Sequence, residues 1–194
     1  MKHFETELPE GYREVFTVDA ADQKTGIKLN LMGLPVLAVT VAAAWLILRP
    51  RESGAHTPAV SSVLLFIGGL LAYLVLHELT HGAAYKLLTR RKLTFGIAPT
   101  VAYCGVPDIY VYRRAALISL LTPFCVFTVV FGVLTAILQA PWDKFLAAVA
   151  LGIHIGSCSG DLYDTFLYLF RFRDPRTLMR DTGPKQTFYV PKSR

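Results

Sequence analysis

Long stretches without a charged side chain constrain this chain more than any other feature. Residues 31–48 and 115–138 contain no Asp, Glu, Lys or Arg, and a helix needs about 20 apolar residues to cross a bilayer. Two further segments, 59–88 and 145–170, reach this length if polar residues near their ends are tolerated. The sequence therefore predicts an all-α integral membrane protein with about four transmembrane helices.

The composition supports a membrane protein and argues against other classes. Hydrophobic residues make up 53% of the 194 positions and charged residues 18%, whereas a typical soluble domain has about 45–50% and about 25%. The net charge is +6, but the basic residues are not spread over a polar surface as in a nucleic-acid-binding protein. We therefore expect the lipid bilayer as a partner and no nucleic acid. The sequence leaves the oligomeric state open.

Polar ends flank the apolar segments and suggest three parts of the chain. Residues 1–28 are polar and mixed in charge, and we expect a polar N-terminal arm with a short strand near residues 12–18. Residues 29–170 hold the four apolar segments and form the predicted membrane domain. Residues 171–194 are rich in Lys and Arg and form a predicted basic cytoplasmic tail.

The connection between the second and third apolar segments differs from the other connections. Residues 94–97, 101–104 and 109–112 have the composition of short strands, and they are separated by Pro and Gly residues. Runs of β-branched and aromatic residues bounded by such turn residues indicate strands. A small β-hairpin or sheet is therefore predicted between helices 2 and 3.

The distribution of Lys and Arg predicts the orientation. With four spans, the N-terminal arm, residues 86–114 and the tail lie on one side of the membrane, and they hold 17 of the 20 basic residues. Because Lys and Arg concentrate on the cytoplasmic side of membrane proteins, this side is cytoplasmic. We therefore expect a multi-pass protein of a bacterial plasma membrane with both termini in the cytoplasm.

One motif in the second apolar segment can carry chemistry. His77, Glu78 and His81 form an HExxH pattern, which on a helix places both imidazoles on one face for a Zn²⁺ ion and leaves the Glu as general base. Glu78 is the only acidic residue between Glu52 and Asp108. A charge inside a span costs on the order of 3 kcal/mol, so Glu78 is a functional candidate. The alternative is a polar cluster that caps the helix at the membrane interface.

A third zinc ligand is expected from the fourth apolar segment. His154, Cys158 and Asp161 follow a spacing of i, i+4 and i+7 and share one helical face, and Asp164 lies one turn further. From the helix rise, Asp161 lies roughly 13 Å deep, between the two motif histidines at about 10 and 16 Å. Asp164 lies about 9 Å deep and His154 about 24 Å deep.

Depth therefore favours Asp161 as the third ligand. Asp164 is the alternative ligand, and Asp164 and His154 are also candidates for side chains that support the ligands without binding zinc. His154 can also be interpreted as a buried, hydrogen-bonded core histidine, and Cys158 as a small buried apolar residue.

Taken together, these features resemble the family known as putative zincin membrane peptidases. The resemblance covers about residues 60–170 and is carried by HELTHG, the β-rich stretch, YRRAALISLLTPF and the Gly160-Asp161 pair. The family is similar in plan to the site-2 proteases, which cleave substrates within the membrane. The resemblance implies that zinc is bound by His77, His81 and Asp161, with Glu78 as the catalytic base.

We therefore expect a membrane-embedded zinc metalloprotease that cleaves membrane or membrane-associated proteins near the cytoplasmic side. Glu78 would act as general base on a zinc-activated water. The strands within residues 94–112 either offer an edge to an extended substrate or form a cap that shields the site. The alternative functions are a non-proteolytic zinc-binding scaffold and a metal-ion transporter.

Overall fold

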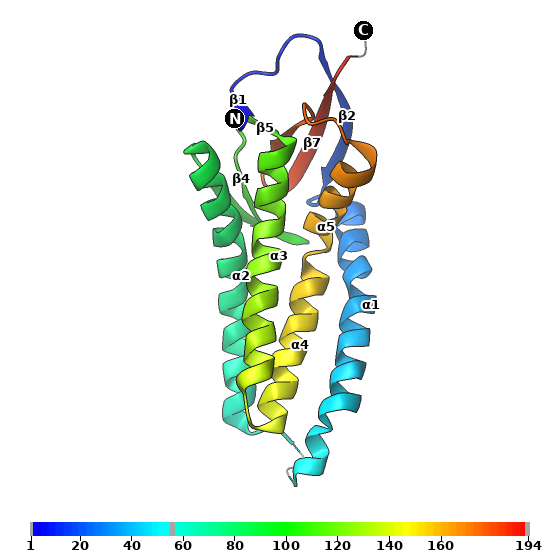
Figure 1. Ribbon diagram of the computed structural model, residues 1–194, viewed down its shortest axis with the longest axis vertical. Helices are drawn as coiled ribbons and strands as arrows, with labels where there is room; N and C mark the ends of the chain where they lie inside the picture. Colours follow the sequence, from blue (N-terminus) through cyan, green and yellow to red (C-terminus); the bar gives the residue numbers. More distant parts are fainter. Residues whose placement is uncertain (1, 55–56, 193–194) are drawn as a thin grey trace. The chain divides into compact units, whose positions relative to one another are not determined.

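The computed structural model describes residues 2–54 and 57–192 and combines long helices with two antiparallel sheets (Figure 1). The helices are α1 (Gln23–Leu48), α2 (Val60–Thr89), α3 (Arg113–Ile137), α4 (Pro141–Ser157) and α5 (Ser159–Phe166), with a 3₁₀ turn at Pro50–Ser53 and a π-helical turn at Leu167–Arg171. The strands are β1 (Phe4–Glu5), β2 (Tyr12–Asp19), β3 (Thr94–Ala98), β4 (Val101–Gly105), β5 (Tyr110–Tyr112), β6 (Leu178–Asp181) and β7 (Lys185–Pro191). Ser193 and Arg194, at the end of the predicted tail, lie outside the described residues.

The structure has three or four candidates for the predicted membrane spans. Helices α1, α2 and α3 are long and apolar enough to cross a membrane, and the broken pair formed by α4 and Ser159–Arg171 makes a fourth candidate. The fourth span was predicted as one helix over residues 145–170, whereas the structure interrupts it at Cys158. The interruption falls in the run Gly156–Gly160, which contains only Gly, Ser and Cys and favours a helix weakly.

The chain divides into two compact units. The sheet unit comprises Met1–Leu29, Glu78–Pro123 and Gly160–Arg194, and the helical unit comprises Asn30–His77 and Phe124–Ser159. Helix α2 runs without interruption through the boundary between His77 and Glu78.

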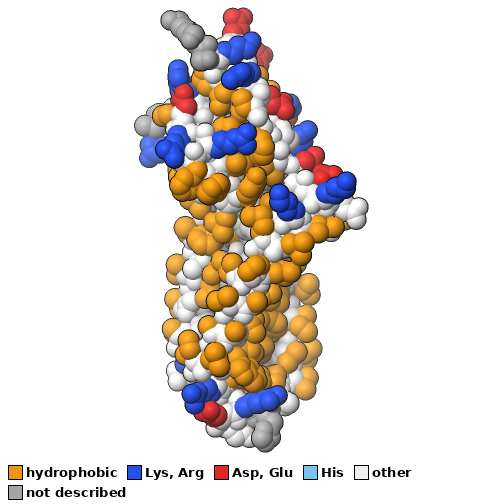
Figure 2. Space-filling model, turned by 90° about the vertical axis from the view of Figure 1, so that its right-hand side faces the viewer, with side chains coloured by type: hydrophobic (Ala, Val, Ile, Leu, Met, Phe, Trp, Pro, Cys, Tyr) orange, Lys and Arg blue, Asp and Glu red, His pale blue; other side chains and the backbone are white. Residues whose placement is uncertain are grey.

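The helical unit exposes apolar side chains to its surroundings, and its helices run side by side (Figures 1 and 2). Leu65 and Ile47 are 77% and 75% exposed, and apolar surface of this extent is typical of a surface that contacts a membrane or another protein. Helices α1 and α4 meet at Gly33 and Gly156, where a Cβ atom on Gly33 would collide with the backbone of Gly156. Small residues commonly allow such close contacts between membrane helices.

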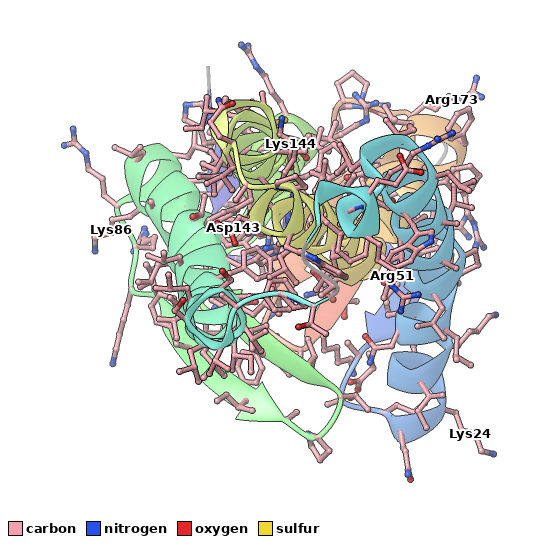
Figure 3. All side chains as sticks on the ribbon, turned by 90° about the horizontal axis from the view of Figure 1, so that it is seen from below. Lys24, Arg51, Lys86, Asp143, Lys144 and Arg173 are labelled. Carbon is pink, nitrogen blue, oxygen red and sulfur yellow. The ribbon has the colours of Figure 1, made fainter. Side chains whose placement is uncertain are left out.

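Aromatic and basic side chains mark the loop end of the helical unit. The Trp45 ring lies 6.1 Å from the Trp142 ring and 5.6 Å from the Phe145 ring, and the Arg51 guanidinium lies 5.2 Å above Trp45. Figure 3 shows Arg51 and Lys144 at this end. Trp side chains and basic residues are typical of a membrane–water interface, and this end carries both.

The sheet unit corrects the all-α prediction. Its five-stranded sheet has the order β1-β5-β6-β7-β2, and β2 pairs antiparallel with β7, with Thr17 opposite Thr187. The predicted strand near residues 12–18 is confirmed as β2, whereas β6 and β7 form from the predicted tail. Buried side chains of this unit include Val111, Met179 and Phe188. The polar arm and the basic tail thus build a common apolar core.

The predicted hairpin after the second helix is confirmed and lies against α2. Strands β3 and β4 form a separate two-stranded sheet, whereas β5 joins the larger sheet. A Cβ atom on Gly82 would lie 2.8 Å from the Phe95 ring and 3.3 Å from the Cys104 sulfur. Gly82 therefore allows the hairpin to approach the helix directly after the HExxH motif.

Candidate metal centre

Helix α2 positions the HExxH motif as the sequence predicts. His77 and His81 lie one turn apart on this continuous helix, and both side chains are buried. Glu78 follows His77 and is half-buried. The helix thus aligns two imidazoles on one face with a carboxylate beside them, an arrangement suited to a metal ion and a general base.

The structure brings Asp161 to His81 within the sheet unit. Atom Oδ2 of Asp161 lies 3.3 Å from Nε2 of His81. Two ligands at zinc distances of about 2.0–2.2 Å in a tetrahedral site are separated by roughly 3.4 Å. The pair therefore has the spacing of two ligands of one zinc ion, and its donor types, an imidazole nitrogen and a carboxylate oxygen, are those of catalytic zinc sites.

A main-chain carbonyl fixes the His81 ring. Atom Nδ1 of His81 lies 2.9 Å from the carbonyl oxygen of Ser119, and a carbonyl only accepts hydrogen bonds, so Nδ1 carries the proton. This carbonyl is available because Pro123, four residues later inside α3, has no N–H to donate to it. With zinc bound, Nε2 of His81 would therefore be the ligand atom, on the side of Asp161.

The hairpin provides a polar contact for Glu78. The backbone N–H of Cys104 in β4 donates a hydrogen bond to the Glu78 carboxylate. Since Gly82 allows β3 and β4 to lie directly on this part of α2, the carboxylate is held between the helix and the hairpin. A fixed carboxylate next to a metal ligand can accept and deliver a proton in a defined direction.

His77 has polar partners in the helical unit. Its Nδ1 lies 3.1 Å from the Tyr73 hydroxyl, which also lies 2.9 Å from Nδ1 of His154. The ligand atoms of His77, His154 and Cys158 all lie within 4.8 Å of one another and form a second group of potential metal ligands. The Tyr73 hydroxyl contacts the Nδ1 atoms of both histidines, so its hydrogen bonds account for the closeness of the two rings.

Asp164 lies apart from these contacts. Its side chain is 3% exposed, and among the described residues its Oδ1 has no hydrogen-bond partner. The role of Asp164, as the alternative ligand or as a supporting side chain, stays a prediction.

Another buried acid of the sheet unit, Asp181, accepts a hydrogen bond of 2.6 Å from the Tyr85 hydroxyl. Burial raises the pKa of Asp181 to about 6.

Sequence reasoning missed the groups that orient the histidines. Two signals were present: Tyr73 precedes His77 by one helical turn, and Pro123 follows Ser119 by four residues. Both signals are local in sequence, but the contacts of Tyr73 with His154 and of Ser119 with His81 form only when the chain folds. His154, predicted as a supporting side chain or a core histidine, is fully buried and hydrogen-bonded to Tyr73.

Comparison with known proteins adds independent information on this centre. Residues 70–175, which include the motif and Asp161, match the family described as "Putative zincin peptidase". No curated protein and no solved structure was found to match the chain. Because the match covers more than half of the chain, the protein belongs to the putative zincin peptidase family.

Proposed function

We propose that the protein is a membrane-embedded zinc metallopeptidase in which zinc is held by His77, His81 and Asp161. The observation that carries the proposal is the 3.3 Å separation of His81 Nε2 and Asp161 Oδ2 on the face of an HExxH helix. His77 completes the set because it lies one turn before His81 on the same helix.

The proposed mechanism assigns the proton transfers to Glu78. Zinc, when bound, polarises the scissile carbonyl and makes its water more acidic. Glu78 accepts a proton from the attacking water and returns it to the leaving amine. The Cys104 N–H donates a hydrogen bond to the Glu78 carboxylate. His77, His81 and Asp161 would hold the zinc.

A substrate in extended form fits the hairpin. Strand β3 pairs with β4 and is an edge strand, and its Phe95 and Ile97 side chains are 47% and 88% exposed. An extended peptide can add to such an edge through main-chain hydrogen bonds. We propose a membrane-protein substrate whose unwound segment pairs with β3, close to Glu78.

The charge distribution supports a cytoplasmic position for this chemistry. Figure 3 shows Lys24, Lys86 and Arg173 of the sheet unit pointing outward. Basic side chains flanking membrane helices favour the cytoplasmic side. We propose that the sheet unit, both termini and the substrate edge face the cytoplasm of a bacterial cell.

A variant of Glu78 tests the proposal. Glu78→Gln leaves the zinc ligands intact but removes the group that takes a proton. The purified variant is expected to keep about one zinc per chain, measured by elemental analysis, and to cleave a membrane-protein substrate at least 10²-fold more slowly. Glu52→Gln, which changes an exposed acid in the loop after α1, is the matched control. Near-parental cleavage by Glu78→Gln would refute the peptidase mechanism.

The alternative function is non-hydrolytic zinc binding, as a scaffold or a transporter. The second ligand group, His77, His154 and Cys158, is the observation that favours it. A purely structural or transporting site has no need for Glu78. The same variant therefore separates the two functions, because it would leave transport or structural binding unchanged.

A further inference from the structure

The Tyr73 hydroxyl is the centre of a buried hydrogen-bond network in the helical unit. It lies 3.1 Å from His77 Nδ1, 2.9 Å from His154 Nδ1 and 2.9 Å from the Ser157 hydroxyl. Tyr73 is 4% exposed, and His154 is fully buried. We propose that Tyr73 and His154 are positioning residues that fix the tautomer of His77, a role that rests on His77 being a zinc ligand.

The direction of the network is set at its far end. Nε2 of His154 lies 3.2 Å from the carbonyl oxygen of Phe124 and 3.2 Å from the Thr128 hydroxyl. Because a carbonyl oxygen only accepts hydrogen bonds, Nε2 of His154 carries the proton. A neutral imidazole with a proton on Nε2 has its lone pair on Nδ1. His154 therefore presents an acceptor to Tyr73.

The proton order then continues through Tyr73 to His77. The single hydroxyl proton of Tyr73 is donated to Nδ1 of His154, at 2.9 Å. The Tyr73 oxygen is left as an acceptor, and its partner at 3.1 Å, Nδ1 of His77, is the donor. His77 thus carries its proton on Nδ1 and its lone pair on Nε2, the same tautomer that Ser119 imposes on His81.

The Ser157 hydroxyl is compatible with this order but does not set it. It donates to the main-chain carbonyl of His154 at 2.9 Å, or it donates to the Tyr73 oxygen, which can accept two hydrogen bonds. The second arrangement keeps both contacts of the Tyr73 oxygen at 2.9 Å, with the Tyr73 proton on the His154 side. Removal of the Ser157 hydroxyl is therefore expected to leave the His77 tautomer unchanged.

Aromatic packing holds the network in place. The Tyr73 ring lies 5.1 Å from Phe127 and 5.5 Å from Phe131, and the His77 ring is stacked on Phe127 at 6.3 Å. These rings pack around the Tyr73 ring, and at this burial water competes little with the hydrogen bonds of the hydroxyl. The network therefore orients His77 before metal binding, and loss of such a supporting partner typically weakens metal binding 10–100-fold.

The direct test uses Tyr73→Phe, which keeps the ring and removes only the hydroxyl. Zinc affinity is measured on the full chain in detergent by competition with a chelator. We expect a 10–100-fold weaker affinity for Tyr73→Phe. Ser157→Ala and Tyr110→Phe, the latter in the sheet unit, are the matched controls and should stay within about threefold of the parent protein. Parental zinc affinity in Tyr73→Phe would overturn the proposal.

A spectroscopic readout tests the tautomer without zinc or catalysis. In the metal-free chain with ¹⁵N-labelled histidine, the His77 signals should show a protonated Nδ1 in the parent protein and in Ser157→Ala. In Tyr73→Phe, they should show a mixture of tautomers. A proton on Nε2 of His77 in the parent protein would contradict the network. If His77→Ala binds zinc like the parent, the proposed ligand set fails, whereas the tautomer result still decides the role of Tyr73.

Discussion

The carbonyl oxygen of Ser119 lies 2.9 Å from Nδ1 of His81. It accepts this hydrogen bond because Pro123 removes the N–H that would otherwise bind it in helix α3. A proline inside a candidate transmembrane helix thus contributes to the chemistry of a histidine on another helix. Such a link between backbone and ligand is a common way to fix the orientation of a metal-binding imidazole.

Replacement of this proline should weaken zinc binding. In Pro123→Ala, the new backbone N–H at position 123 competes with His81 for the Ser119 carbonyl. We expect about tenfold weaker zinc affinity, measured by chelator competition. Pro35→Ala, which restores a backbone donor inside α1, is the control and should bind zinc like the parent protein. Equal affinities of the Pro123→Ala and Pro35→Ala variants would show that the Ser119 carbonyl does not orient His81.

The two acids of α5 should differ in their effect on zinc. Oδ2 of Asp161 lies 3.3 Å from His81 Nε2. Removal of a residue that only supports a ligand weakens metal binding 10–100-fold, so Asp161→Ala is expected to weaken zinc binding by more than this. Asp164 is buried and, among the described residues, its Oδ1 has no partner. Asp164→Ala should therefore retain zinc, as measured by elemental analysis of the purified variants. The reverse pattern would assign the third ligand to Asp164.

The buried Asp181 should make stability depend on pH. Burial raises its pKa from 3.8 to about 6. Between these values the folded protein holds a proton that the unfolded chain has released, so the free energy of unfolding falls as pH rises. The total effect is about 3 kcal/mol.

In Asp181→Asn this contribution is absent. Thermal unfolding in detergent between pH 4 and 7 should therefore show a flatter pH dependence for the variant than for the parent protein. The difference between the two proteins isolates Asp181 from other acids, such as Asp174, whose pKa is lowered by its hydrogen bond to Arg176. Parallel curves would contradict the raised pKa of Asp181.

The contact of α1 and α4 should tolerate no side chain at Gly33. Because a Cβ atom there meets the backbone of Gly156, Gly33→Ala is expected to lower the free energy of unfolding by about 1–3 kcal/mol. Gly132→Ala in α3 is the control, since a Cβ atom at Gly132 meets nothing within 4 Å and Ala favours the helix. The melting temperatures of the two variants are compared in detergent. A melting temperature of Gly33→Ala equal to that of the parent protein would argue against the close contact.

The features that the sequence predicts well are those set by local periodicity. The apolar run of residues 115–138 corresponds to α3 at Arg113–Ile137, and the i, i+4 spacing places both motif histidines on one face of α2. The depth argument selected Asp161, the acid that lies next to His81. The helical predictions succeed because helix rise and rotation are the same in every α-helix, and the role of Asp161 as a zinc ligand stays a prediction.

Long-range pairing explains what the sequence did not reveal. Strands β2 and β7 pair across 170 residues at Thr17 and Thr187, and no local pattern specifies such a partner. The Tyr73–His154 contact, across 81 residues, is hidden for the same reason. The break at Cys158 was missed because residues 145–170 were predicted as one continuous helix, although the small residues around Cys158 favour a helix weakly.

X-ray absorption at the zinc edge of the purified, zinc-loaded protein tests the central claim most directly. Zinc held by His77, His81 and Asp161 should have only nitrogen and oxygen neighbours, at about 2.0–2.2 Å, with the scattering pattern of two imidazoles. Cys158→Ser should give the same spectrum. A sulfur neighbour at about 2.3 Å that disappears in Cys158→Ser would contradict the account and place zinc at His77, His154 and Cys158 instead.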